Sequence, residues 1–167
     1  IAEIRSVSRT GNGEADGFFA ASRNAEREAY GVQSAIIADQ QWRWYLLAGN
    51  PADPLAADFR DKATVGSFIG ANMLDWLREK GYRVQASPPT TEALLKMLRA
   101  GRIDAILANN LVMEQLIREQ GLEGRLRSVL QEDKPLGVYF SKTFLARNPG
   151  FLERFNEQVA ACRKPTR

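Results

Sequence analysis

The stretch GEADGFFAASRNAERE, residues 13–28, places polar and charged residues directly behind a short apolar run. Arg27, near the end of this stretch, is permanently charged. If its side chain binds a ligand, the chain is a binding protein. Other kinds of chemistry lack the residues that they need. The chain has no histidine and one cysteine, Cys162, which excludes imidazole acid–base catalysis, zinc sites of the usual kind and intramolecular disulfides.

The remaining reactive side chains favour structural roles. Cys162 lies near the end of a predicted amphipathic helix, and because a nucleophile there would lack a histidine partner, we expect a buried or half-buried apolar residue. Asp16 and Asp104 belong to predicted strand motifs and are expected to make structural hydrogen bonds. Neither is paired in sequence as a catalytic dyad.

Composition indicates a globular, soluble protein. The chain has 167 residues, 44% hydrophobic and 26% charged, enough to bury one sizeable core or two small ones. It has no apolar run long enough to span a membrane, and residues 1–13 lack the apolar stretch of a signal peptide, so any export signal is expected to be absent from this sequence. The net charge is +3, but the basic residues are scattered among 20 acidic ones, which argues against a nucleic-acid partner.

Strands that alternate with helices must position these side chains. Between residues 63 and 130, Gly and Pro signals, helix caps and apolar spacing predict a parallel sheet covered by helices, an α/β fold. The predicted strands are 15–20, 42–47, 63–69, 82–87, 102–108, 125–130 and 136–141. The predicted helices are 72–81, 91–101, 111–120 and 148–162, with a polar turn or short helix at 24–31 and a loop at 48–62.

Polar residues at the predicted helix starts have two possible roles. Thr90 or Thr91 can cap the helix 91–101, Asn110 the next helix, and Asn148 the last, with Pro149 in its first turn. Asn72 follows VGSFIG at the start of a helix, where backbone N–H groups and the helix dipole favour an anion; plain N-capping is the alternative, and the two are compatible.

Aromatic residues of the predicted strand 42–47 alternate in direction. Trp42 and Trp44 point one way, and Arg43 and Tyr45 the other. We assign the tryptophans to the core or to a hinge first. The opposite face is expected to look toward a cleft or toward solvent.

Four motifs, taken in order, carry a family resemblance: GEADG with NAERE around Arg27, VGSFIGAN, LLKMLRAGRIDAILANN, and GVYFSK before a helix that contains FN. The chain resembles the extracytoplasmic solute-binding proteins of the amino-acid-binding type, family 3. That resemblance implies the type II periplasmic binding protein fold, with two α/β lobes joined by crossover strands and closing over ligand in a Venus flytrap motion. Lobe 1 would hold residues 1–38 and 137–167, and lobe 2 residues 39–136; no cofactor or metal is implied.

The family pattern also implies elements that this sequence does not show. The first strand, first helix and second strand of lobe 1 have no counterpart before Ile1, so lobe 1 is expected to be incomplete. The sequence could be a fragment, or its start could be assigned too late. Alternatively, another chain could supply the missing strands, for example in a homodimer.

The resemblance assigns ligand-binding roles in lobe 1. Arg27 stands where the family's arginine forms a bidentate pair with the ligand carboxylate, which suits the planar guanidinium. Ser22 falls where a family hydroxyl contacts the ligand, and Arg23 could be a second cation at the mouth of the site. The alternative for Arg27 is a surface arginine paired with Glu26 or Glu28.

In lobe 2, Asn72 could help to hold the carboxylate, and Asn109 departs from the family. Asn109 stands where amino-acid binders place an aspartate for the ligand's ammonium. A neutral amide loses that ion pair, so the resemblance predicts weaker or different recognition of the amine. Alternatively, Asn109 or Asn110 simply caps the next helix.

Three functions remain open. The first is a non-catalytic binding protein, periplasmic or extracytoplasmic, that captures a small carboxylated, amino-acid-like metabolite for an ABC permease or a membrane sensor. The second is a lyase or dehydratase on the same fold, for which Glu14 or Glu26 would have to be the acid. The third is a regulatory or interaction protein with a degenerate pocket, suggested by the missing start of lobe 1, by Ala20 and Ala21 at positions that are commonly polar, and by Asn109.

Overall fold

The computed structural model describes residues 10, 12–23 and 25–163, and the chain divides into two compact units. Unit 1 comprises Ile1–Gln40 and Lys134–Arg167, and unit 2 comprises Gln41–Asp133. That these units are the two lobes expected from the sequence, with boundaries at 38/39 and 136/137, stays a prediction. The expectations about residues 1–9 lie outside the described residues.

Unit 1 is built on a small antiparallel sheet. Strand β8 (Gly137–Ser141) lies in its centre, between β1 (Gly17–Ala21) and β2 (Gly31–Gln33). Phe18 and Tyr139 stack in its core, with ring centroids 5.3 Å apart and ring planes 6° from parallel. Strand β2 was not expected from the sequence, because it has only three residues and begins at Gly31, where the predicted turn or short helix 24–31 ends.

Unit 1 also contains the helices α2 (Ala25–Tyr30), α7 (Lys142–Arg147) and α8 (Phe151–Cys162). The single helix expected over 148–162 is wrong at its start. Asn148 instead closes α7, donating from Nδ2 to the Phe144 oxygen, and Gly150, with a φ of 73°, is the N-cap of α8. Cys162 is exposed, so the expectation of a buried or half-buried residue is also wrong.

Unit 2 contains a five-stranded mixed sheet in the order β5-β4-β6-β3-β7. Strands β4 (Thr64–Gly66), β5 (Arg83–Ala86) and β6 (Ala105–Asn109) are parallel, as expected. Strand β3 (Gln41–Leu47) runs antiparallel to β6 and to β7 (Leu126–Asp133), so the parallel pattern predicted from residue 63 onward does not extend to β3 and the sheet is mixed. Alternating strands and helices predict parallel pairs only where a crossover helix joins the strands.

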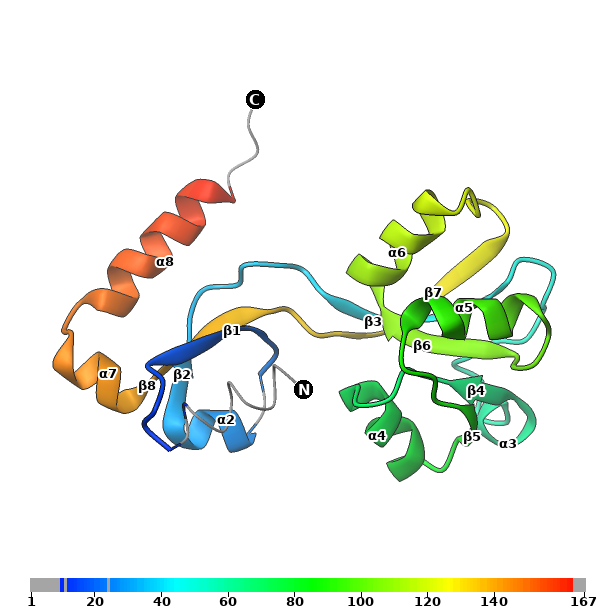
Figure 1. Cartoon of the computed structure of the whole chain (residues 1–167), viewed down its shortest axis with the longest axis horizontal. Coiled ribbons are helices and arrows are strands. Elements are labelled where there is room, and N and C mark those ends of the chain that lie inside the picture. The colour runs from blue at the N-terminus through cyan, green and yellow to red at the C-terminus, as the bar shows by residue number, and fades with distance from the viewer. Residues whose placement is uncertain (1–9, 11, 24, 164–167) are drawn as a thin grey trace. The chain divides into compact units, whose positions relative to one another are not determined.

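Helices cover both faces of this sheet (Figure 1). On one face, Trp42 and Trp44 pack with α3 (Phe59–Lys62) and α4 (Asn72–Glu79). On the other, Tyr45 packs with α5 (Thr91–Arg99) and α6 (Asn110–Glu119), so the expectation that Tyr45 faces a cleft or solvent is wrong. The tryptophans belong to the core, and the expected loop 48–62 contains the short helix α3.

Side-chain hydrogen bonds fix several turns of unit 2. Thr90 caps α5, its hydroxyl oxygen accepting from the Ala93 N–H at 3.1 Å, and Asp104 accepts from both the N–H and the hydroxyl of Thr64 at 2.7 Å. These bonds confirm the cap at Thr90 and the structural role of Asp104.

Strand β7 extends to Asp133, beyond the expected end at residue 130.

Candidate functional site

Arg27 is the central residue of the candidate site in unit 1. Strand β1 ends at Ala21, the chain turns, and α2 carries Arg27 back over the start of the strand. The Arg27 side chain is only 6% exposed; Nη1 donates to the Ser22 carbonyl oxygen at 2.7 Å, and the guanidinium carbon lies 5.9 Å from the centroid of the Phe18 ring. The alternative of a surface arginine is therefore wrong.

The structure brings Ser22 to Arg27 but gives Arg23 a different environment. Ser22 is half-buried and contacts Arg27 through its main-chain oxygen. Arg23 is exposed and forms an ion pair with Glu28, with 3.0 Å between Nε and Oε1. Because both partners are exposed, this ion pair is worth little stability.

Tyr30 is a neighbour of Arg27 that sequence reasoning missed. It lies three residues later on the same helix, and its ring packs against Phe18 with centroids 6.4 Å apart. The Tyr30 hydroxyl is buried without a hydrogen-bond partner among the described residues. Burial raises the pKa of Tyr30, while the charge of Arg27 lowers it. The sequence feature that could have pointed to Tyr30 is its i, i+3 spacing from Arg27, which places both side chains on the same face of a helix.

In unit 2, Asn72 and Asn109 lie at the same edge of the sheet. Asn109 is the last residue of β6, and Asn72 comes after the carboxyl end of β4, the parallel neighbour of β6. In α/β sheets this edge is where ligands bind. Asn72 is exposed at the first position of α4, whereas the N-cap is Ala71 with no side-chain cap bond, so Asn72 does not cap that helix.

Asn109 is the cap of α6. Its Oδ1 accepts from the Val112 N–H at 2.9 Å, which confirms the capping alternative for Asn109 and corrects the cap expected at Asn110. Asn110 uses its Oδ1 to accept from the Gln41 N–H at 2.7 Å, which ties α6 to the start of β3.

Ser67, the residue after β4, is a further candidate that the sequence analysis did not predict. It is fully buried, and its hydroxyl has no hydrogen-bond partner in the part of the chain that the structure describes. A buried hydroxyl without a hydrogen-bond partner is a candidate ligand contact. Leaving its hydrogen bond unmade costs about 1–3 kcal/mol, and a ligand could recover that cost. The sequence feature that could have pointed to Ser67 is a hydroxyl residue directly after the carboxyl end of a predicted buried strand.

Metal and membrane features are absent from the described residues. In residues 10, 12–23 and 25–163, no group of three or more Cys, Asp or Glu side chains could hold a metal ion. Within the same residues, no helix combines the length and the apolarity that crossing a membrane requires.

Comparison with solved structures identifies the fold. The chain is similar to the GluR0 ligand-binding core of Nostoc punctiforme, solved with L-glutamate: TM-score 0.71, 19% identity, covering 94% of this chain and 71% of that one. It is also similar to the second substrate-binding domain of a putative amino acid ABC transporter from Streptococcus pneumoniae (TM-score 0.62, 20% identity, 96% and 72% covered). A third similar structure is arginine-bound ArgBP from T. maritima (TM-score 0.67, 14% identity, 94% and 72% covered).

No protein-family model and no curated protein matches the sequence. The likeness to solved structures lies below 25% identity and therefore establishes the fold alone. The chain has the mixed α/β fold of type II periplasmic binding proteins, as the sequence predicted. Ligand-binding roles for Arg27, Ser22, Arg23, Asn72 and Asn109 stay predictions.

Proposed function

We propose that this chain is an extracytoplasmic solute-binding protein that captures a small carboxylated, amino-acid-like ligand for ABC-type uptake or for sensing. Its ligand-binding residues would be Arg27, Ser22, Asn72 and Asn109, with Arg23 as an outer cation. The proposal is supported by similar solved proteins, described as ligand-binding or substrate-binding, of which one was solved with L-glutamate and another with arginine. A membrane permease or sensor would be its partner.

The observation that carries the proposal is the position of Arg27. Arginine holds carboxylates through two parallel hydrogen bonds, and a guanidinium that is fixed in one plane suits this role. Arg27 is held from one side by the Ser22 carbonyl and lies over the Phe18 ring, which fixes the plane of its fork. A fixed, partly desolvated fork binds a carboxylate more tightly than a mobile surface arginine does.

Asn109 supports a narrower statement about the ligand. Its Oδ1 already accepts the cap bond from Val112, and Nδ2 can only donate. A ligand ammonium, which also only donates, gains no ion pair there. We therefore propose that the site does not depend on a free α-amino group, as it does in relatives that carry an aspartate at this position.

The first test is native mass spectrometry of the purified chain, under conditions that keep small molecules and oligomers bound. A retained small mass that is lost in Arg27→Lys and kept in Arg147→Gln, which changes an exposed arginine of α7 outside the proposed site, would support the proposal. Arg27→Lys keeps the positive charge and removes the planar fork. A dimer that carries the mass would support completion of lobe 1 by a second chain.

Calorimetric titration then tests the amine with L-glutamate and its desamino analogue, glutarate. Similar affinities for both would support the statement about Asn109, and the variant Asn109→Asp, which keeps the cap, should tighten only glutamate. A strong preference of the natural chain for glutamate would overturn it. Turnover of the bound molecule would favour the enzyme, and a specific protein partner without any small ligand would favour the interaction protein.

A further inference from the structure

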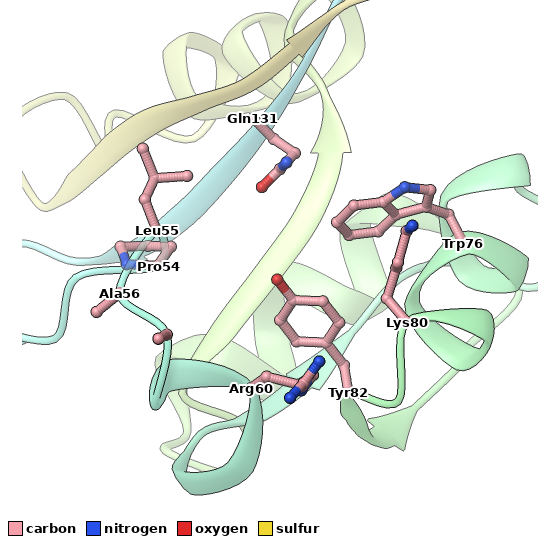
Figure 2. Close-up of a pocket in the computed structure, with 9 residues that line it drawn as sticks. Pro54, Leu55, Ala56, Arg60, Trp76, Lys80, Tyr82 and Gln131 are labelled. Atoms are coloured by element: carbon pink, nitrogen blue, oxygen red, sulfur yellow. The ribbon is translucent and has the colours of Figure 1, made fainter.

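Unit 2 contains a pocket of about 350 Å³ that the proposed solute site does not use. It lies between the loop 54–57 and the sheet face covered by α4, and Figure 2 shows the side chains of Trp76, Tyr82 and Gln131 around it. Its lining mixes aromatic rings with nitrogen donors, and no acidic side chain contributes to it.

The aromatic wall of the pocket is held rigidly from behind. Trp76 and Tyr82 stack with centroids 5.5 Å apart and planes 28° from parallel, and the Tyr82 ring also packs against buried Trp44 at 5.3 Å. Burial raises the pKa of Tyr82, so its hydroxyl, which points into the pocket in Figure 2, stays protonated at neutral pH. Flat rings of this kind stack with planar aromatic ligands.

Two cations stand at the rim. Arg60 comes from α3 and Lys80 from the end of α4. Arg60 forms an ion pair with Asp61, whose Oδ1 lies 3.4 Å from the Arg60 Nε, and both side chains of that pair are largely exposed. Such an ion pair is weak, so the rim keeps a net positive charge that attracts an anion.

Gln131 fixes the polarity of the opposite wall. The Trp44 indole Nε1 donates to the Gln131 Oε1 at 2.8 Å. Because an indole N–H can only donate, the atom that it contacts must be the amide oxygen, which sets the orientation of the amide. This bond leaves the two Nε2 hydrogens of Gln131, a residue that lines the pocket, for a different acceptor.

We propose that this pocket is a second binding site, for a small aromatic carboxylate that carries an oxygen acceptor at its far end. The ring packs on Trp76 and Tyr82, the carboxylate pairs with the rim cations Arg60 and Lys80, and the distal oxygen accepts from Gln131. All of these residues belong to unit 2, so the site does not depend on Arg27 or on the proposed solute function.

The probe is 4-hydroxybenzoate, measured by saturation-transfer difference NMR on the full chain. Its matched controls are 4-hydroxybenzyl alcohol, which lacks the charge, and cyclohexanecarboxylate, which lacks the aromatic ring. We expect the probe to bind, and we expect the saturation-transfer signal of either control compound to be at least tenfold weaker. No response to the probe, or an equal response to either control, would overturn it.

Three variants locate the binding. Lys80→Gln should weaken the probe about tenfold, as loss of a charge-assisted contact does. Arg78→Gln removes the same charge from the same exposed helix surface outside the pocket and should leave binding unchanged. Gln131→Glu keeps the oxygen that Trp44 needs and places a negative charge against the ligand, so binding should be lost while circular dichroism stays unchanged.

Binding of the probe must persist in Arg27→Lys, where the proposed solute site is disabled. Loss of the probe there, or its survival in Gln131→Glu, would place the probe elsewhere and overturn the proposal. A chain that binds this probe at unit 2 but binds neither an amino acid nor its desamino analogue would contradict the proposed function while leaving the second site in place.

Discussion

Arg27 donates a hydrogen bond from Nη1 to the main-chain oxygen of Ser22, five residues earlier in the chain, at 2.7 Å. This bond closes the turn between β1 and α2, so the residue proposed to hold the ligand also holds its own loop. Stability and binding can therefore change together at this position.

Replacing Arg27 should destabilise the chain even without ligand. Arg27→Met leaves the Ser22 carbonyl without its donor and removes the cation over Phe18, which should lower the free energy of unfolding by about 1–3 kcal/mol. Urea unfolding measures this change. The control, Arg23→Met, removes an exposed ion pair and should change stability by less than about 0.5 kcal/mol. Equal effects of the two variants would contradict the burial of Arg27.

The cap at Asn109 predicts a difference between two substitutions. Asn109→Ala removes the acceptor for the Val112 N–H and should cost about 1 kcal/mol of stability, whereas Asn109→Asp keeps an acceptor there and should cost little. Chemical denaturation of both variants checks the prediction. If the alanine variant were as stable as the natural chain, Asn109 would not be the cap.

Gly66, the last residue of β4, should not accept a methyl group. A Cβ there would lie 2.8 Å from the Leu94 Cδ1 and 2.9 Å from the Ala86 oxygen, so Gly66→Ala should destabilise unit 2 by about 1–3 kcal/mol. Gly49→Ala is the control, because nothing lies within 4 Å of its new Cβ. Thermal unfolding of the two variants gives the comparison, and similar melting temperatures would refute the prediction.

Cys162 should react freely in the folded protein. Because its side chain is exposed, a thiol reagent such as Ellman's reagent should modify it at nearly the same rate in buffer and in urea. A folded protein that reacts only after unfolding would mean that Cys162 is covered.

The ion pair between Asp58 and Lys62 gives a prediction about pH. A hydrogen bond from Lys62 lowers the pKa of Asp58 below its ordinary 3.8, and the same bond raises the pKa of Lys62 above 10.5. The stabilisation is present above pH 3.8 and is lost as the pH falls through the lowered Asp58 pKa; at the alkaline end it is lost as the pH rises through the raised Lys62 pKa.

Carboxyl ¹³C NMR titration measures the acidic limb. Lys62→Gln should return the Asp58 midpoint toward 3.8, whereas Lys96→Gln, which removes the partner of Glu92, should leave it unchanged. An Asp58 midpoint that does not move in Lys62→Gln would show that the hydrogen bond is not the cause.

The helices of unit 2 could be predicted because apolar spacing and terminal signals agree in them. Leu94 and Leu98 mark the buried stripe of α5, and Thr90 and Gly101 mark its ends. The direction of β3 could not be predicted, since Trp42 and Trp44 show the same alternation in a parallel or an antiparallel strand.

The candidate site was predictable only in part. The resemblance pointed to Arg27, but its burial depends on Phe18, nine positions earlier, and local sequence does not encode that contact. Asn109 and Asn110 are both good capping residues. The choice between them depends on where β6 stops, because the cap needs extended backbone, and Asn109 has a ψ of 141°. Tyr30 lay in a segment expected only as a turn or short helix.

The pairing of β3 with β7 has a consequence for how unit 2 can be handled. Gln41 and Asp133, its first and last residues, are cross-strand partners, so the chain enters and leaves this unit at adjacent points. A segment whose ends meet can be circularly permuted, or transplanted into a surface loop of another protein, through a short linker. Gln41 and Asp133 are therefore the natural boundaries for such a permutation or insertion.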